Sequence, residues 1–344
     1  MANVIKVSAV PYVDGPDLAP GWVAETIAIW TQFPARKGIL DLTNRNIVDL
    51  PPEIFRMRKL ETLILNNNKI TTIPSDLGKL AEAKLLHTIE CENNSLADVG
   101  DDVGKISSLE TIKFAHNQLQ VVPSFVERLY QLISLDLSYN QIEEVPAALG
   151  NLLFLENLNI SNNQIKILPQ PLMNLQQLQI LDISFNQIEC ISPAIRNMSR
   201  LITLRINNNQ LEALPLELGF LLSLEELQIE NNPLHAQAEI NEQSLYSRAE
   251  ILNFLRGRIR EHEELRMNLF TERDSKHNSF FEVIDGETKP QLVGATPEKL
   301  ILYLTQVSLP GKSKQSNRSQ KINGCRRYEN LLLFGYVLFL FHYP

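Results

Sequence analysis

The stretch Leu132-Ile-Ser-Leu135-Asp-Leu137-Ser-Tyr-Asn140 recurs in close copies further along the chain. The copies read Leu155-Glu-Asn-Leu158-Asn-Ile160-Ser-Asn-Asn163, Leu178-Gln-Ile-Leu181-Asp-Ile183-Ser-Phe-Asn186 and Leu201-Ile-Thr-Leu204-Arg-Ile206-Asn-Asn-Asn209. Alternate residues of an extended strand point to opposite sides, so the leucine and isoleucine positions are predicted to face a core and the residues between them to face outward. One strand cannot bury its own apolar side, and the pattern therefore predicts stacked repeats.

The asparagine that ends each copy extends the register in both directions. Asparagines follow one another at steps of 23 residues from position 94 to position 232. An earlier copy ends at Asn68, 26 residues before Asn94, because three residues are inserted near 81–84, and the first copy has Arg45 at this position. The chain is thus predicted to contain about nine units.

These asparagines are predicted to be structural. Each lies where a strand must turn, and its amide can pair with backbone groups that the turn leaves without partners. Loss of one such residue is expected to cost on the order of 1 to 3 kcal/mol. The predicted asparagine ladder consists of Asn68, Asn94, Asn117, Asn140, Asn163, Asn186, Asn209 and Asn232.

Beyond the asparagine, most units continue with two apolar residues and a proline, as in Ile142-Glu-Glu-Val145-Pro146 and Leu211-Glu-Ala-Leu214-Pro215. The whole pattern resembles the leucine-rich repeat family, and its 23-residue form resembles the intracellular, Ras-associated subgroup of that family. The resemblance implies an α/β solenoid, or horseshoe, in which residues 38–235 form a parallel sheet on the concave side. The proline is expected to open the return segment of each unit.

Both ends of such a stack need covers, because an open end exposes core and unpaired strand edge. Residues 1–37 are predicted to form the N-terminal cap, with a helix over 21–30 that places Trp22, Ile27 and Trp30 near one face. Residues 236–275 are predicted to contain a C-terminal capping helix, from about 247 to 270, with Ile251 and Leu255 on its apolar face.

The residues between the strand leucines and those just before the asparagines form columns on the concave face. The second column contains His116, Tyr139 and Phe185 among asparagines. Aromatic and arginine side chains dominate protein interfaces. We therefore predict a contact patch for a protein partner. It consists of His116, Asp136, Tyr139, Asp182, Phe185 and Arg205. The alternative is that these residues are ordinary consensus choices that support the strands.

The region after the repeats carries a second resemblance. Residues 292–305 are similar to the opening of the N-terminal helical module of Ras guanine nucleotide exchange factors. Thr296 is a plausible helix N-cap followed by a proline at the first helical position. The alternative is an isolated helix. The resemblance implies that 276–307 contain a truncated module and that the chain lacks a catalytic exchange domain.

Charge and composition separate the C-terminal tail from the rest. The formal net charge is −8, and from residue 310 onward six basic residues oppose one acid, so the tail carries +5 and the rest −13. An acidic protein is a poor ligand for nucleic acid and favours a basic protein partner. Residues 308–344, basic and then apolar, are expected to be poorly ordered. Their 11-residue apolar run (331–341) is too short to span a bilayer, which takes about 20 residues, although contact with a membrane surface is an alternative.

No residue pattern in the sequence supports catalysis, a cofactor or a metal. Cys91, Cys190 and Cys325 show no CxxC spacing and indicate a reducing compartment, and the N-terminus has no signal-peptide pattern, so a cytoplasmic location is expected. The sequence predicts a monomeric, non-enzymatic scaffold that binds a protein, with a Ras-type small GTPase or its regulators as the expected partner. Two alternatives are a regulatory fragment of an exchange factor and an adaptor for a phosphatase or kinase.

Overall fold

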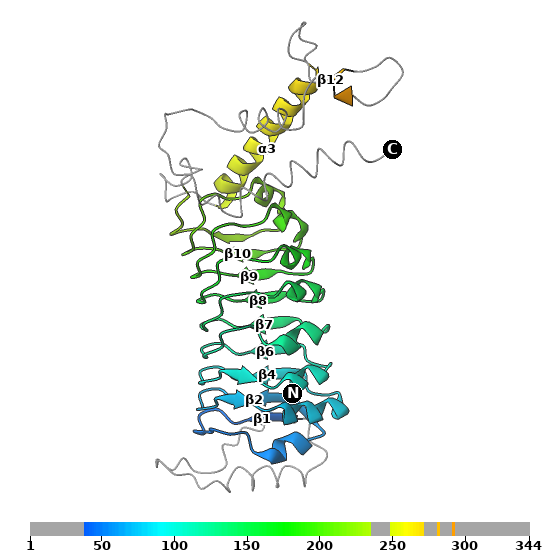
Figure 1. Ribbon diagram of the computed structural model, residues 1–344, viewed down its shortest axis with the longest axis vertical. Coiled ribbons are helices and arrows are strands. Elements are labelled where there is room, and N and C mark those ends of the chain that lie inside the picture. The colour runs from blue at the N-terminus through cyan, green and yellow to red at the C-terminus, as the bar shows by residue number, and fades with distance from the viewer. Residues whose placement is uncertain (1–37, 235–247, 272–280, 283–290, 293–344) are drawn as a thin grey trace. The chain divides into compact units, whose positions relative to one another are not determined.

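The computed structural model describes residues 38–234, 248–271, 281–282 and 291–292 (Figure 1). The predicted N-terminal cap at 1–37 lies outside the described residues, as do the whole tail and all of the predicted exchange-factor module (276–307) except residues 281–282 and 291–292. The chain divides into two compact units, residues 1–253 and 254–344, and all the repeats belong to the first.

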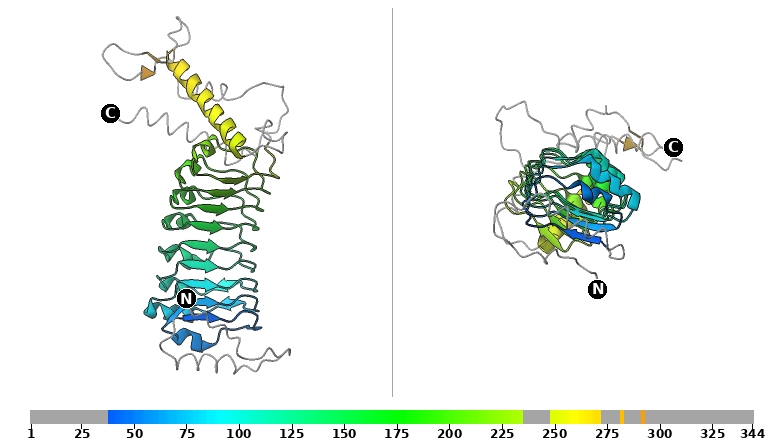
Figure 2. Two further views of the ribbon diagram at one scale, coloured as in Figure 1. Left: turned by 180° about the vertical axis from the view of Figure 1, so that it is seen from behind. Right: turned by 90° about the horizontal axis from the view of Figure 1, so that it is seen from below.

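A parallel sheet of nine strands runs through the repeats in sequence order, which confirms the predicted solenoid (Figures 1 and 2). Its register aligns equivalent positions, so that Leu135 pairs with Leu158 and Leu158 with Leu181. The strands are β1 (Gly38–Asp41), β2 (Leu60–Ile64), β4 (Thr88–Glu90), β6 (Thr111–Lys113), β7 (Ser134–Asp136), β8 (Asn157–Asn159), β9 (Ile180–Asp182), β10 (Thr203–Arg205) and β11 (Glu226–Gln228).

The core lies behind this sheet and consists of stacked aliphatic side chains. In the unit around β7, Leu135 and Leu137 are 1% and 0% exposed, while Asp136 between them is half-buried on the open face. Each leucine buried in this way contributes roughly 1.5 to 3 kcal/mol before the loss of chain entropy. Stacking therefore supplies the stability that no single repeat has.

The return segments form short 3-10 helices on the side of the core away from the sheet (Figure 2). A proline immediately precedes most of them; Gly100 and Ser192 take its place before η3 and η7. The 3-10 helices are η1 (Pro52–Arg56), η2 (Ser75–Ala83), η3 (Asp101–Lys105), η4 (Ser124–Arg128), η5 (Ala147–Asn151), η6 (Gln170–Asn174), η7 (Pro193–Asn197) and η8 (Leu216–Phe220).

The three-residue insertion is absorbed in this layer and leaves the sheet undisturbed. η2 has nine residues where η1 has five, and it ends at Lys84 in a left-handed conformation with φ 51°. A two-stranded parallel ladder of β3 (Thr72–Ile73) and β5 (Asp98–Val99) links this unit to the next.

At the C-terminal end, helix α3 (Arg248–Thr271) lies within the segment predicted as a capping helix. Its first turns carry the buried residues Ile251 and Leu252, and the Arg248 guanidinium donates a hydrogen bond to the Leu224 carbonyl of the last repeat. The predicted helix at the C-terminal end is therefore confirmed, and its first turn bonds to the last repeat. Further on, β12 (Phe281–Glu282) pairs antiparallel with β13 (Gln291–Leu292).

Candidate protein-binding surface

The asparagine column ties each repeat to the one before it. Asn163 is 8% exposed, and its Nδ2 donates to the carbonyl of Leu137 in the preceding repeat at 3.0 Å and to the carbonyls of Ile160 and Ser161 at 3.1 Å. Its Oδ1 accepts from the backbone N of Ile142, also in the preceding repeat, at 2.9 Å. The same bridge to the preceding repeat recurs from Asn68 to Asn232. These side chains face inward, and their donors and acceptors are already used in hydrogen bonds within the protein.

The neighbouring position, one residue earlier, has the opposite character. All its residues adopt the left-handed conformation, with φ between 53° and 59°, and we call them the left-handed column: Asn44, Asn67, Asn93, His116, Tyr139, Asn162, Phe185, Asn208 and Asn231. Asparagine tolerates this conformation, whereas larger side chains adopt it at a cost. His116, Tyr139 and Phe185 are therefore exceptions at a position where the backbone favours asparagine.

Two of these exceptions contact each other on the surface. The rings of His116 and Tyr139 stack with their centroids 4.0 Å apart and an interplanar angle of 12°. Tyr139 is 49% exposed and Phe185 50% exposed. Because the backbone of the column is held by inter-repeat bonds, such as Tyr139 N to the Ser161 carbonyl at 3.0 Å, the rings are presented from a rigid base.

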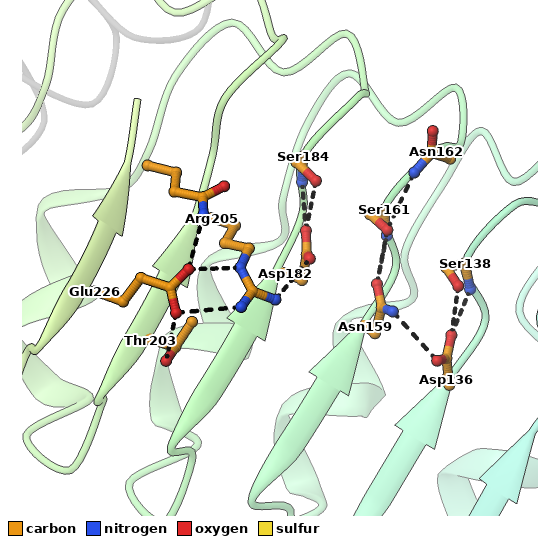
Figure 3. A network of polar contacts seen from close by, with 11 residues as sticks. Asp136, Ser138, Asn159, Ser161, Asn162, Asp182, Ser184, Thr203, Arg205 and Glu226 are labelled. Atoms are coloured by element: carbon orange, nitrogen blue, oxygen red, sulfur yellow. Dashed lines mark hydrogen bonds and ion pairs between the residues drawn. The ribbon is translucent and has the colours of Figure 1, made fainter. Parts of the chain in front are cut away.

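The strand-centre column holds Asp136, Asn159 and Asp182, and its first task is to support the turn (Figure 3). Oδ1 of Asp136 accepts from the backbone N and the hydroxyl of Ser138 at 2.9 and 2.7 Å. Oδ1 of Asp182 does the same for Ser184 at 3.0 and 2.6 Å. Asn159 and Ser161 form the third such pair. These bonds assign the two aspartates a structural role whether or not they also contact a partner.

Arg205 is likewise engaged within the sheet (Figure 3). Its Nε and Nη2 lie 2.9 and 3.1 Å from the two carboxylate oxygens of Glu226, and its Nη1 lies 3.4 Å from Oδ2 of Asp182. The hydrogen bond and charge of Glu226 raise the pKa of Arg205, and those of Arg205 lower the pKa of Glu226. Arg205 is therefore neutralised before any partner arrives.

A second charged group lies on the N-terminal side of the aromatic pair. Lys113 forms an ion pair with Glu90 at 2.9 Å, and that hydrogen bond raises the pKa of Lys113. The pKa of Glu92 is raised, mainly because burial disfavours its charged form. The positive charge of Lys113 lowers this pKa, and the negative charges of Glu90 and Asp136 raise it. The carboxylate of Glu92 is thus partly buried and lies near other carboxylates.

The structure brings four of the six predicted contact residues into two small groups, His116 with Tyr139 and Asp182 with Arg205. Phe185 and Asp136 lie on the same face, and among the described residues their side chains form no hydrogen bond, ion pair or ring stacking with either group. Sequence reasoning missed Glu226 and Glu92 on this face. It also missed the serines, although the recurring Asp-x-Ser and Asn-x-Ser triplets are a signal for side chains that support turns.

The cysteines depart from the expectation drawn from their spacing. Cys91 is a free, buried thiol in the core, and burial raises its pKa to about 12. Cys190 is disulfide-bonded, so the absence of CxxC spacing was a wrong guide for this residue. Among the described residues, no cluster of histidine, cysteine or acidic side chains is suited to hold a metal ion. None of the helices described here combines the length and apolar character needed to cross a bilayer.

Comparison with family models identifies the repeats. Models described as "Leucine-rich repeat region", "Leucine rich repeat" and "Leucine Rich Repeat" match residues 146–244, 39–87 and 131–152. Together with the nine-stranded parallel sheet, these matches show that the repeats of this chain are leucine-rich repeats arranged as a solenoid. Among curated proteins no sequence matches.

Solved structures of a bacterial protein and of a receptor show a similar fold. A leucine-rich repeat protein of Leptospira interrogans is 33% identical with a TM-score of 0.55, over 57% of this chain and 49% of that one. A TDR receptor is 25% identical with a TM-score of 0.53, over 66% of this chain and 40% of the receptor. The chain thus spans about half of the leptospiral protein and two fifths of the receptor.

Proposed function

We propose that this chain is a non-enzymatic scaffold that binds a protein partner on the open face of its sheet. Leucine-rich repeats are interaction modules in general, and the face of this one carries Tyr139 and Phe185, each about half exposed. The observation that carries the proposal is that these rings, with His116, replace asparagine at left-handed positions. Residues held in a disfavoured backbone conformation cluster at functional sites, because another benefit must offset the strain.

Within the predicted patch the residues have different roles. Tyr139, Phe185 and His116 are exposed and supply contact area. Asp136, Asp182 and Arg205 are engaged in bonds with their neighbours, so in this proposal they hold the face in shape. An interface centred on a few aromatic anchors fits the general finding that a minority of residues carries most of the binding energy.

For the partner we propose a Ras-type small GTPase or one of its regulators. The support is the resemblance of the 23-residue units to the Ras-associated subgroup, together with that of 292–305 to an exchange-factor module. Binding of a panel of Ras-type GTPases, each loaded with GDP or with a non-hydrolysable GTP analogue, tests this part. Co-purification of a phosphatase or kinase instead, with no GTPase bound, would favour the adaptor alternative.

The binding face itself is tested by Tyr139→Ala and Phe185→Ala, measured by calorimetry against the captured partner. We expect each to weaken binding at least tenfold, because truncating an interface anchor costs about 2 kcal/mol or more. Phe220→Ala is the matched control, since Phe220 is 49% exposed but lies at the end of η8, away from the sheet. Undiminished binding by both sheet variants would rule out this face.

A further inference from the structure

A second set of exposed apolar side chains lies at the opposite end of the strands from the left-handed column. Tyr130, Leu153 and Phe154 are 60%, 58% and 57% exposed. Tyr130 follows the residue that caps η4, and Leu153 and Phe154 follow the residue that caps η5. Tyr130 and Leu153 are 23 residues apart and thus hold the same position in neighbouring repeats. We call these three residues the edge patch.

The edge patch spans two adjacent repeats; along the same edge Leu85 and Leu222 are also exposed, at 37% and 82%, in repeats that do not adjoin it. At the equivalent positions the preceding repeat has Ser107 and Ser108, and the following repeat has Gln176 and Gln177. The fold therefore accepts polar side chains here, and the core does not require apolar ones. A single exposed leucine such as Leu222 needs no explanation, but exposed apolar side chains gathered in two adjacent repeats mark an interaction surface.

Acidic groups flank the patch where the strands begin. Ile133 lies between Glu110 and Glu156 in adjacent repeats, because its backbone N bonds to the Glu110 carbonyl and its own carbonyl accepts from Glu156 N, both at 2.8 Å. Neither glutamate side chain has an ion pair or hydrogen bond within the described part of the chain. Arg128, which precedes the patch in sequence, is held by Asp101 at 2.9 Å.

We infer that the edge patch is a second docking surface, which takes a segment of a partner protein with apolar side chains beside lysine or arginine. The apolar part would cover Tyr130, Leu153 and Phe154, and the cations would pair with Glu110 and Glu156. Charge complementarity selects this occupant, since the patch is bordered by carboxylates whose charge nothing in the described structure balances. The surface is independent of the sheet face, so either proposal can fail alone.

The experiment uses the full chain and a display library of random 16-residue peptides. Peptides are selected on the native chain and counter-selected on the double variant Leu153→Ser/Phe154→Ser, and affinities are then measured by fluorescence anisotropy. We expect the recovered peptides to combine apolar residues with lysine or arginine. Their affinity should fall at least tenfold on Glu110→Lys/Glu156→Lys. It should be unchanged on Val121→Ser/Ile167→Ser, which alters exposed apolar residues elsewhere.

Three results would overturn the inference. One is the recovery of no peptide that distinguishes the native chain from the patch variant, provided that both have the same circular dichroism spectrum. Another is a set of peptides without basic residues, or peptides insensitive to the glutamate changes. The third is sedimentation of the native chain as a dimer that Leu153→Ser/Phe154→Ser dissociates, since a second copy would then be the occupant.

Discussion

The asparagine column and the left-handed column are neighbours along every strand end, yet they differ in nearly every physical respect. Asn163 is 8% exposed and makes four hydrogen bonds, three of them as a donor. Tyr139 and Phe185, one residue before such asparagines, are about half exposed. The asparagine position must satisfy buried backbone groups, and asparagine occupies it in every repeat except the first, which has Arg45. The position before it needs only a left-handed backbone, so its side chains can vary with function.

This difference shows where functional information lies in a repeat protein. A constant column reports the architecture, because the same bonds recur in each repeat. A column whose backbone is constant but whose side chains vary reports what distinguishes one repeat from the next. In this chain the departures from asparagine fall at His116, Tyr139 and Phe185, in the central repeats.

The sharpest way to break the comparison is to remove one asparagine from each column in the same repeat. Asn163→Ala should lower the free energy of unfolding by about 3 kcal/mol, because buried carbonyls and the Ile142 amide lose their partner. Asn162→Gly, which keeps the left-handed backbone accessible, should change it by less than about 0.5 kcal/mol. Urea unfolding measures both. Equal losses would show that the two columns are not energetically distinct.

A smaller effect of opposite sign is expected in the left-handed column. Phe185→Asn should raise the free energy of unfolding by about 0.5 to 1 kcal/mol, because asparagine tolerates φ near 53° better than phenylalanine and the exposed ring loses little packing. The reverse change, Asn162→Phe, should lower stability by a similar amount. Urea midpoints with an unchanged slope check both. A destabilised Phe185→Asn would mean that the ring contributes to folding rather than to binding.

The sequence predicted the architecture well because leucine spacing and the asparagine bridge are local and repeated. The nine strands, the return that follows Pro146 and the helix that starts at Arg248 all follow from such patterns. Side-chain contacts between different repeats were harder to predict from the sequence. Arg205 and Glu226 are 21 residues apart, and only the register of β10 and β11 brings them together. The stacking of His116 on Tyr139 depends on the left-handed backbone at both positions. Histidine and tyrosine do not suggest that conformation, so the stacking could not be predicted from the residue types.

The smallest effect concerns the ion pair that neutralises Arg205, and it tests whether the strand-centre column is structural. Arg205→Ala should lower the free energy of unfolding by less than about 1 kcal/mol at pH 7, because both partners are more than a third exposed and solvent screens the pair.

This contribution should depend on pH. Arg205 lowers the pKa of Glu226 in the folded state, so the contribution is present above the usual glutamate range and is lost as the pH falls through the folded-state value. The native chain and the variant should therefore differ in urea midpoint at pH 7 and converge toward pH 3. A difference that persists at acid pH would show that Arg205 acts through packing rather than charge. If partner binding instead fell tenfold with stability unchanged, Arg205 would belong among the contact residues as its sequence pattern predicts.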